Sequence, residues 1–169
     1  MGKINHLDEN LNLEGKRALL RVDFNVPTNN GSITEVSRIE KVLPTIEFLI
    51  KKKVKIIIIS HLGRPKGKIV PELTLKPIAE KLSSYLKKNV SFLEKNIGKS
   101  IIEKSKKLLN GEIILLENLR FNKEEELNSQ SFAKELSKNG DIYINEAFSC
   151  SHRAHASVCE ITKHIKSYA

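Results

Sequence analysis

The sequence predicts an α/β fold: a three-layer, Rossmann-like domain built around a mainly parallel sheet. Short apolar blocks rich in β-branched residues alternate with stretches of helical periodicity, which is the pattern of repeated strand-helix units. A hydrophobic fraction of 40% and a charged fraction of 29% are typical of a globular domain with a packed core. We therefore expect residues 1–169 to form one domain, with right-handed connections between parallel strands.

Five blocks are predicted to be strands, because each is short, apolar and bounded by turn residues. They are residues 18–24 (ALLRVDF), 54–60 (VKIIIIS), 90–93 (VSFL), 112–117 (EIILLE) and 141–145 (DIYIN). In open α/β sheets, ligands bind beyond the carboxyl ends of the strands. A site is therefore expected among the residues that follow these blocks.

Five helices are predicted between and after the strands. The first has an apolar face made of Ile39, Val42, Leu43, Ile46, Leu49 and Ile50. The second has an apolar face made of Leu75, Ile78, Ala79, Leu82 and Leu86. Pro44 should kink the first helix, and Thr74 should be the N-cap of the second. Shorter helices are expected at about residues 96–109 and 129–138, and a last one should begin near His155.

The net charge of +9 suits either a polyanion or a small acidic ligand. Most of the cations are lysines, which gather at the ends of the predicted helices, as in residues 51–53 and 87–88, and indicate a solvated surface. Aromatic residues make up only 5% of the chain and do not alternate with the basic positions, so a stacking surface for nucleic acid is lacking. We expect a small acidic ligand and no nucleic acid; a nucleic-acid-binding module is the alternative.

The chain shows no sign of a membrane segment or a secretory leader. No apolar run approaches the ~20 residues of a membrane helix, and residues 1–10 lack a signal-peptide core. Two cysteines, Cys150 and Cys159, are too few for the disulfide framework of a secreted domain. We expect a cytoplasmic protein with reduced thiols and no membrane association.

The segment IIIISHLGRPKGK, residues 56–68, leads from a predicted strand into glycines and cations. A P-loop needs four residues between its glycines and a Ser or Thr after its lysine. Here three residues separate Gly63 from Gly67, and Ile69 follows Lys68. No other glycine-rich turn opens a helix. We predict that this loop binds an anion, but not in the manner of a P-loop.

Arginines are scarce in this lysine-rich chain, so their positions are informative. Arg64, Arg120 and Arg153 lie within a few residues of the carboxyl end of a predicted strand, and Arg38 follows the loop after the first strand. A guanidinium group binds phosphate or carboxylate with paired hydrogen bonds, which an ammonium group cannot copy. Four such groups at one sheet edge predict a pocket for a small, multiply charged anion.

Other polar residues lie beside these arginines. His61 and His152 are near Arg64 and Arg153 in the sequence and could each donate to the same anion. Asp23 and Asn25 are two residues apart and should point to the same side of the chain. They could neutralise an arginine-rich pocket or bind a hydroxyl group of the ligand.

Two alternative interpretations concern the same segments. Each arginine could instead pair with a nearby acid such as Glu117 or Glu146. Zinc would accept the ligand types of the segment CSHRAHASVC, which are Cys150, His152, His155 and Cys159. Their spacing is not that of a zinc site, however, and Arg153 would place a cation beside the metal ion. We expect no metal site.

Six segments resemble motifs of the phosphoglycerate kinase family, in its N-terminal half and in the family's order and spacing. They are LLRVDFNVP, ITEVSRI, SHLGRPKGK, LTLKPIAEKL, LLENLRFNKEEE and INEAFSCSHRAHAS, and they cover nearly the whole chain. The last is similar to the family's NDAFGTAHRAH, with Glu146 in place of Asp and with Ser149, Cys150 and Ser151 in the variable middle. The resemblance implies the N-terminal, substrate-binding half of a two-domain kinase fold, ending near the hinge.

The resemblance also implies an activity, which is reversible phosphoryl transfer between ATP and the carboxylate of 3-phosphoglycerate. The products are 1,3-bisphosphoglycerate and ADP, in glycolysis and gluconeogenesis. Mg-ATP or Mg-ADP would bind mainly in the C-terminal domain, outside residues 1–169. We therefore expect a monomeric chain that binds the acid substrate and is inactive by itself; a fragment that merely folds is the alternative.

Roles for individual residues follow from the same resemblance. The residues expected to hold the 3-phosphate are Arg64, Arg120 and Arg153, with His61 and His152. Asp23 and Asn25 should hold the 2-hydroxyl group. Arg38 should be catalytic, because it would lie at the substrate carboxylate and stabilise the charge that develops during phosphoryl transfer.

Overall fold

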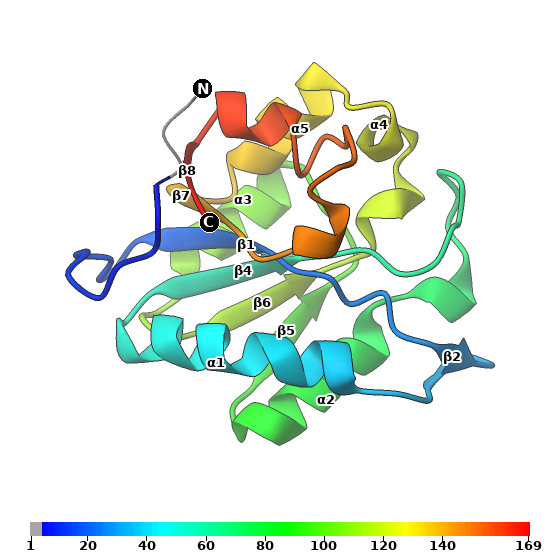
Figure 1. Ribbon diagram of the computed structural model, residues 1–169, viewed down its shortest axis with the longest axis horizontal. Helices are drawn as coiled ribbons and strands as arrows, with labels where there is room; N and C mark the ends of the chain where they lie inside the picture. The colour runs from blue at the N-terminus through cyan, green and yellow to red at the C-terminus, as the bar shows by residue number, and fades with distance from the viewer. Residues whose placement is uncertain (1–4) are drawn as a thin grey trace.

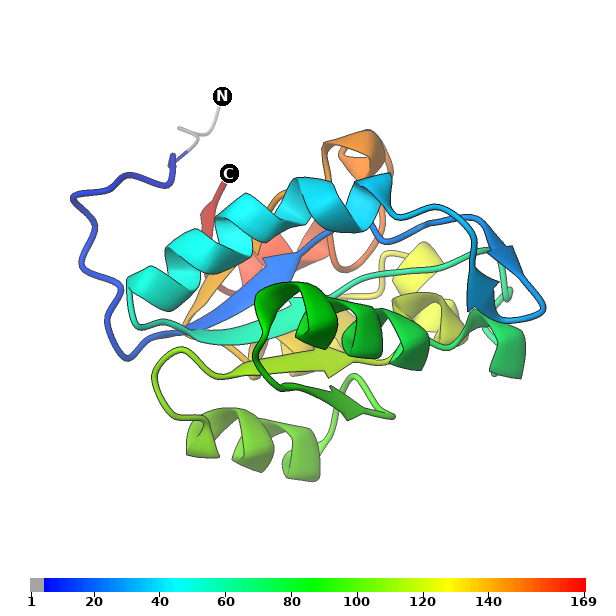
Figure 2. The same ribbon diagram turned by 90° about the horizontal axis from the view of Figure 1, so that it is seen from below.

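The computed structural model describes residues 5–169 and shows an α/β domain in three layers (Figure 1 and Figure 2). Within this range, six strands form one sheet in the order β5-β6-β4-β1-β7-β8, and every neighbouring pair is parallel. The strands are β1 (Arg17–Arg21), β4 (Lys55–Ile59), β5 (Val90–Leu93), β6 (Ile113–Leu116), β7 (Ile142–Asn145) and β8 (Lys166–Tyr168). The predicted fold class is confirmed.

Helices cover both faces of the sheet (Figure 1 and Figure 2). Helices α1 (Ser37–Lys51) and α2 (Lys76–Leu86) pack on one face. Helices α3 (Lys99–Lys107) and α5 (Gln130–Ser137) pack on the other, and a single turn, α4 (Lys123–Glu126), precedes α5. The four longer helices agree with those that the periodicity predicts, apart from their ends.

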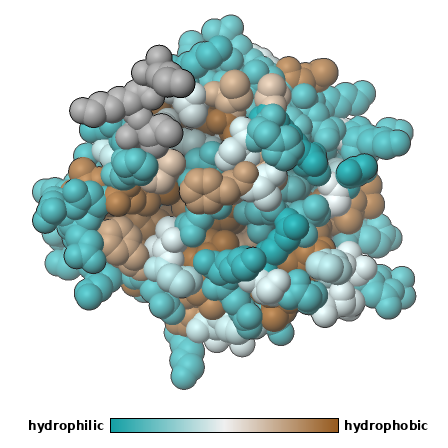
Figure 3. Space-filling model, in the orientation of Figure 1, coloured by the Kyte–Doolittle hydropathy of each residue, from teal (hydrophilic) through white to brown (hydrophobic). Residues whose placement is uncertain are grey.

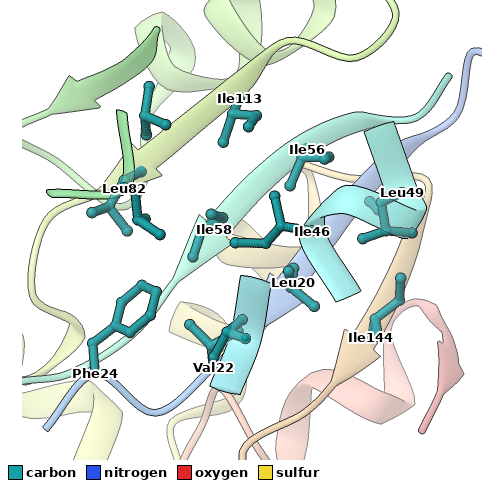
Figure 4. Close-up of a cluster of buried hydrophobic side chains, with 14 of the residues drawn as sticks. Leu20, Val22, Phe24, Ile46, Leu49, Ile56, Ile58, Leu82, Ile113 and Ile144 are labelled. Atoms are coloured by element: carbon teal, nitrogen blue, oxygen red, sulfur yellow. The ribbon is translucent and has the colours of Figure 1, made fainter. Parts of the chain in front are cut away.

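The central strands are buried on both faces, which is why they read as continuous apolar blocks rather than alternating ones. Leu20 of β1 faces the layer of α1 and α2, whereas its neighbour Leu19 faces the opposite layer. Figure 4 shows the first of these cores, where Ile46 of α1 and Leu82 of α2 meet the sheet beside Ile58. All five side chains are fully buried, so this packing fixes the position of the strand ends that carry the polar residues.

The C-terminal segment differs from the prediction. In place of a helix near His155, the chain forms a short 3-10 helix, η4 (Glu160–Lys163), and then the unpredicted edge strand β8. With three residues, β8 is too short to carry a periodic apolar pattern. Contacts with distant parts of the chain hold this strand in place: β8 pairs with β7, and the backbone of Ala169 exchanges hydrogen bonds with Asn5 and Leu7.

Two details of the helices also differ from or extend the prediction. Helix α1 runs without a break across Pro44, which lacks the amide hydrogen of a normal helical residue, and the kink expected there stays a prediction. Thr74 is not the N-cap of α2, because that position is occupied by Leu75. The carboxylate of Glu117, which follows β6, accepts from the Leu75 amide at 2.9 Å and from the Thr74 hydroxyl at 2.7 Å. Glu117 therefore satisfies the start of α2 from across the sheet edge.

The strand order creates a switch point beside β1. From β1 the chain adds β4, β6 and β5 on one side and then returns to place β7 on the other side. Segments after β1, β4, β6 and β7 therefore meet at the carboxyl edge of the sheet, at the right in Figure 1. A small hairpin, β2 (Thr28–Asn29) with β3 (Ser32–Ile33), extends from this edge. The edge is the expected place for a ligand.

Hydrophilic side chains cover most of the face shown in Figure 3, with apolar residues visible between them. None of the helices in residues 5–169 combines the length and apolar character that crossing a membrane requires.

The loop that follows β4 is packed closely at Gly67. This residue has a φ of +73°, and its amide donates to the carbonyl of Arg120 at 3.1 Å. A Cβ atom added there would stand 2.1 Å from Cγ and 3.1 Å from Cα of Lys123. Gly31 has a similar φ of +79°, but an added Cβ would meet nothing within 4 Å. Substitutions at Gly67 and Gly31 therefore distinguish the cost of backbone conformation, which both share, from the cost of close packing, which only Gly67 carries.

We expect Gly67→Ala to destabilise the chain more than Gly31→Ala. Both variants place an L side chain in left-handed backbone, which costs about 1–2 kcal/mol. Gly67→Ala must also push Lys123 aside, which adds roughly 1–3 kcal/mol of overpacking. Urea unfolding of the two variants beside the unmodified chain measures the difference. Equal losses would show that α4 moves away freely and that the loop is not held against it.

Candidate functional site

A cavity of about 140 Å³ opens at the carboxyl edge of the sheet. Its lining contains Asp23, Asn25, Arg38, His61, Arg64, Arg120, Ser149, Cys150 and Arg153. The structure thus brings together all the predicted site residues except His152, which is exposed and does not line the cavity. A wider hollow of about 300 Å³ shares Asp23, Arg38 and Ser149 with this cavity.

The arginines of the cavity are poorly matched by acids. Among the residues that the structure describes, Arg38 pairs with Asp23, and Arg120 forms an ion pair only with Glu126, with 4.0 Å between Nε and Oε1. Among residues 5–169, no ion pair joins Arg64 or Arg153 to a carboxylate. The cavity therefore carries an excess of positive charge that suits an anion.

The alternative of simple arginine-acid pairing is not what the structure shows for Glu117 and Glu146. Glu117 accepts from the backbone amides of Leu75 and Asn118, at 2.9 and 2.7 Å. Glu146 accepts from the hydroxyl of Thr45 at 2.7 Å, and burial raises the pKa of its carboxyl group. Within the described part of the chain, neither acid pairs with an arginine.

The segment after β6 positions Arg120. It belongs to a 3-10 turn, η2 (Leu119–Phe121), and the Oδ1 of buried Asn118 accepts from its amide at 3.1 Å. The side-chain amide of Asn118 also donates to the carbonyl of Leu62 at 2.7 Å, so the ends of β4 and β6 are joined. Arg120 is 3% exposed, and burial with the charge of Arg153 lowers the pKa of its guanidinium group. Its Nε atom is buried without a hydrogen-bond partner among residues 5–169.

The loop after β4 presents its side chains to the cavity and uses its backbone elsewhere. The Gly63 amide donates to Asn25 Oδ1 at 2.9 Å, and the Gly63 carbonyl accepts from Arg120 Nη1 at 2.8 Å. The Gly67 amide is bound to the Arg120 carbonyl. These amides are not available to surround a phosphate as in a P-loop, so an anion here would contact His61 and Arg64 through their side chains.

Among the described residues, Asp23 is the only acid that lines the cavity, and three groups donate to its carboxylate. Its carboxylate accepts from the Ser149 hydroxyl, from the Asn25 amide at 2.9 Å and from Arg38 Nη1. Burial alone would raise the pKa of Asp23, but these hydrogen bonds and the charges nearby, that of Arg38 included, lower it. Asp23 is therefore ionised and fixes the position of Arg38.

Buried Arg21, which the sequence analysis did not assign to the site, determines the state of His61. Arg21 is fully buried, and its Nη2 lies 3.0 Å from His61 Nδ1. A guanidinium group can only donate, so Nδ1 must accept and the proton of the neutral imidazole is on Nε2. Burial, with the charges of Arg21 and Arg120, lowers the pKa of His61 to about 2. His61 is thus an uncharged donor whose Nε2 faces the cavity, 3.9 Å from both Asp23 Oδ1 and Cys150 Sγ.

The buried charge of Arg21 is balanced through a serine. Arg21 Nε donates to Ser157 Oγ at 2.9 Å, and the Ser157 hydroxyl donates to fully buried Glu125 of α4. The Ser157 amide donates to the other oxygen of Glu125 at 2.9 Å. This chain of contacts joins β1 to α4 and to the segment that carries Arg153. A charged residue inside the apolar strand LLRVDF was the only sequence signal for Arg21.

One group of side chains has the spacing of a metal site but not the chemistry of one. The ligand atoms of Asp23, His61 and Cys150 lie within 4.8 Å of one another. However, His61 Nε2 carries the proton and has no lone pair to give, and Asp23 is already paired with Arg38. Cys159, a member of the zinc set considered from the sequence, is exposed and lies outside this group. These contacts favour an anion over a cation.

The chain is similar to known proteins in both sequence and fold. The family model for phosphoglycerate kinase matches residues 8–169. Phosphoglycerate kinases of Finegoldia magna and Leptospira biflexa are each 52% identical over 161 residues, which are 94% and 95% of this chain and 41% of each relative. A phosphoglycerate kinase structure from Coxiella burnetii has a TM-score of 0.83 at 40% identity and covers 94% of this chain and 39% of that one. A structure from Pyrococcus horikoshii has a TM-score of 0.88 at 34% identity, over 98% and 42%.

The state of His61 predicts how stability depends on pH. An unfolded histidine titrates near 6.5, whereas the pKa of His61 is about 2 in the folded chain. Between these values only the unfolded chain binds the proton, so the free energy of unfolding falls as the pH drops below about 6.5. Between roughly pH 7 and pH 5, the free energy of unfolding should therefore fall by about 2 kcal/mol less in His61→Asn than in the unmodified chain.

Urea unfolding at a series of pH values measures this effect, with exposed His6→Asn as the control that should follow the unmodified chain. Identical pH slopes for His61→Asn and the unmodified chain would contradict the neutral, buried imidazole.

Proposed function

The chain belongs to the phosphoglycerate kinase family, and on that premise we propose that its arginine cavity binds 3-phosphoglycerate or 1,3-bisphosphoglycerate. The chain spans about 41% of the length of the curated relatives it matches. The proposed reaction of the whole protein is reversible phosphoryl transfer between ATP and the carboxylate of 3-phosphoglycerate. The observation that carries the proposal is a small cavity with four arginines and one acid.

The 3-phosphate is proposed to lie against Arg64, Arg120 and Arg153. Arg64 and Arg153 have no acidic partner in the described residues, and Arg120 has a buried nitrogen without a hydrogen bond. A phosphate dianion would provide acceptors for all three guanidinium groups. His61 would add a neutral donor through Nε2. His152 is a weaker candidate than the sequence suggested, because it lies outside the cavity.

Asp23 and Asn25 are proposed to orient the 2-hydroxyl group of the substrate. Asp23 is an ionised acceptor, and Asn25 keeps its amide nitrogen for donation because its Oδ1 accepts from Gly63. Both side chains line the same cavity, as expected for residues two apart in an extended segment. A hydroxyl group could donate to Asp23 and accept from Asn25.

Arg38 is proposed to be the catalytic residue. It lines both the small cavity and the wider hollow, so it stands between the proposed phosphate site and the more open space beside Lys41. The substrate carboxylate would lie there and receive the phosphoryl group. No base is required, since a carboxylate attacks without losing a proton. The guanidinium group would stabilise the negative charge that spreads over the transferred group.

Mg-ATP or Mg-ADP would supply the phosphoryl group, and we place its site mainly outside residues 1–169. The amides of the loop containing Gly63 and Gly67 are already bound within the protein. Residues 98–100 read GKS at the start of α3, but Leu93 stands where a P-loop has its first glycine. Neither segment fits a nucleotide phosphate site of that kind. The remaining part of the full-length relatives is the proposed location.

We also propose that the protein acts as a cytoplasmic monomer on small molecules and does not bind nucleic acid. The cavity is built from segments of one chain, so no second copy is needed to complete it.

Titration calorimetry with 3-phosphoglycerate tests the proposed site directly. Removal of one charge-assisted contact costs about 1.5–3 kcal/mol, so Arg64→Ala or Arg153→Ala should weaken binding by roughly 10-fold or more. Lys51→Ala removes the same charge from an exposed end of α1 and should change the affinity by less than about twofold. Equal effects of Arg64→Ala and Lys51→Ala would indicate diffuse attraction by net charge rather than a built site.

A further inference from the structure

Cys150 lies inside the proposed substrate cavity. It ends the 3-10 turn η3 (Phe148–Cys150) after β7, and only 4% of its surface is exposed. Cys150 packs with Ala147 and Val158. Its Sγ lies 3.9 Å from His61 Nε2 and 3.7 Å from Ser149 Oγ. The thiol is therefore closed to bulk solvent by an apolar cluster but borders the space where an anion would lie.

The cavity beside the thiol contains hydrogen-bond donors that could bind oxygen atoms. Arg120, 3% exposed, lines the same cavity, and its buried Nε has no hydrogen-bond partner among the described residues. Among residues 5–169, the Nε2 hydrogen of His61 has only the Cys150 sulfur within hydrogen-bond range. An oxygen atom attached to this sulfur would meet donors that otherwise serve the anion. Modification of Cys150 and binding of an oxyanion therefore compete for the same space and the same donors.

We propose that Cys150 is a peroxide-sensitive thiol and that its oxidation and the binding of the acid substrate exclude each other. The identity of the substrate rests on the proposed function, whereas the competition with an oxyanion rests on the cavity alone. A hydroperoxide is the reagent class that fits, because hydrogen peroxide is small, uncharged and able to enter a cavity of about 140 Å³. Such a site would make substrate binding responsive to oxidants.

The chemical step is a two-electron oxidation of sulfur. The sulfur attacks one oxygen of the peroxide, an S–O bond forms and the O–O bond breaks. The leaving hydroxide takes the thiol proton and becomes water, so Cys–SH and H₂O₂ give Cys–SOH and H₂O. Sulfur is oxidised and the peroxide oxygens are reduced, and no other reagent is needed. Reduction by a thiol restores the cysteine.

Cys159 provides an internal control. It is the other cysteine of the chain, it is exposed, and it does not line the cavity. Peroxide can reach Cys159 whether or not an anion is bound. An effect of ligand on Cys150 alone would therefore report the cavity rather than a general change in reactivity.

The experiment treats the chain with hydrogen peroxide and a dimedone probe for sulfenic acid, with mass spectrometry to quantify each cysteine. The experiment has three arms: one without ligand, one with inorganic phosphate and one with 3-phosphoglycerate. At a ligand concentration ten times its Kd, about one site in eleven is free, so labelling of Cys150 should slow roughly 10-fold. Labelling of Cys159 should be unchanged. Calorimetry on the oxidised chain should show 3-phosphoglycerate binding weakened about 10-fold or more. Cys150→Ser should bind equally well before and after peroxide, and Cys159→Ser should behave as the unmodified chain.

The arms separate failure of this inference from failure of the proposed function. If 3-phosphoglycerate binds but Cys150 is not labelled, or is labelled at the same rate with ligand bound, the inference is wrong and the proposed function stands. If inorganic phosphate protects Cys150 but 3-phosphoglycerate neither binds nor protects, the proposed function is wrong and the peroxide-sensitive anion site stands. Oxidation of Cys150 without loss of affinity would also overturn the inference.

Discussion

The hydrogen bond from Arg21 to His61 is the contact on which the rest of the site depends. A guanidinium group with no exposed surface must have each part of its charge satisfied, since an unpaired buried charge costs several kcal/mol. Arg21 does so by joining β1 to the loop after β4 through His61 and to α4 through Ser157 and Glu125. The same contact sets the proton of His61 on Nε2, so the side chain that faces the cavity is a neutral donor.

The site combines this rigid support with an unfavourable concentration of charge. Guanidinium groups of Arg64, Arg120 and Arg153 lie around one small cavity, and burial together with the charge of Arg153 lowers the pKa of Arg120. Two buried cores on either side of the sheet hold the strand ends that carry them. An anion would offset this charge, and its binding would stabilise the folded chain by linkage. The stability of the folded chain and the affinity of this edge for anions are therefore thermodynamically linked.

The sequence predicted those features that depend on local pattern or on unusual residue choice. Apolar blocks that are buried on both faces identified the central strands. The scarce arginines after those blocks, with the polar residues beside them, identified seven of the nine residues that line the cavity. Strand β8 was missed because three residues carry no period, and Thr74 was misassigned because the acid that satisfies the start of α2, Glu117, is distant in sequence. The role of Arg21 depends on Ser157, 136 residues away, so only the folded chain reveals it.

We propose that the arginine cavity holds the phosphate end of a small acid and directs its carboxylate toward Arg38. A crystal structure of the chain with 3-phosphoglycerate tests it most directly. We predict phosphate oxygens at about 2.7–3.0 Å from nitrogens of Arg64, Arg120 and Arg153, with the carboxylate beside Arg38 at the edge of the wider hollow. Density for the phosphate at the lysine-rich helix ends, or a reversed molecule with its carboxylate against Arg120 and Arg153, would contradict the account.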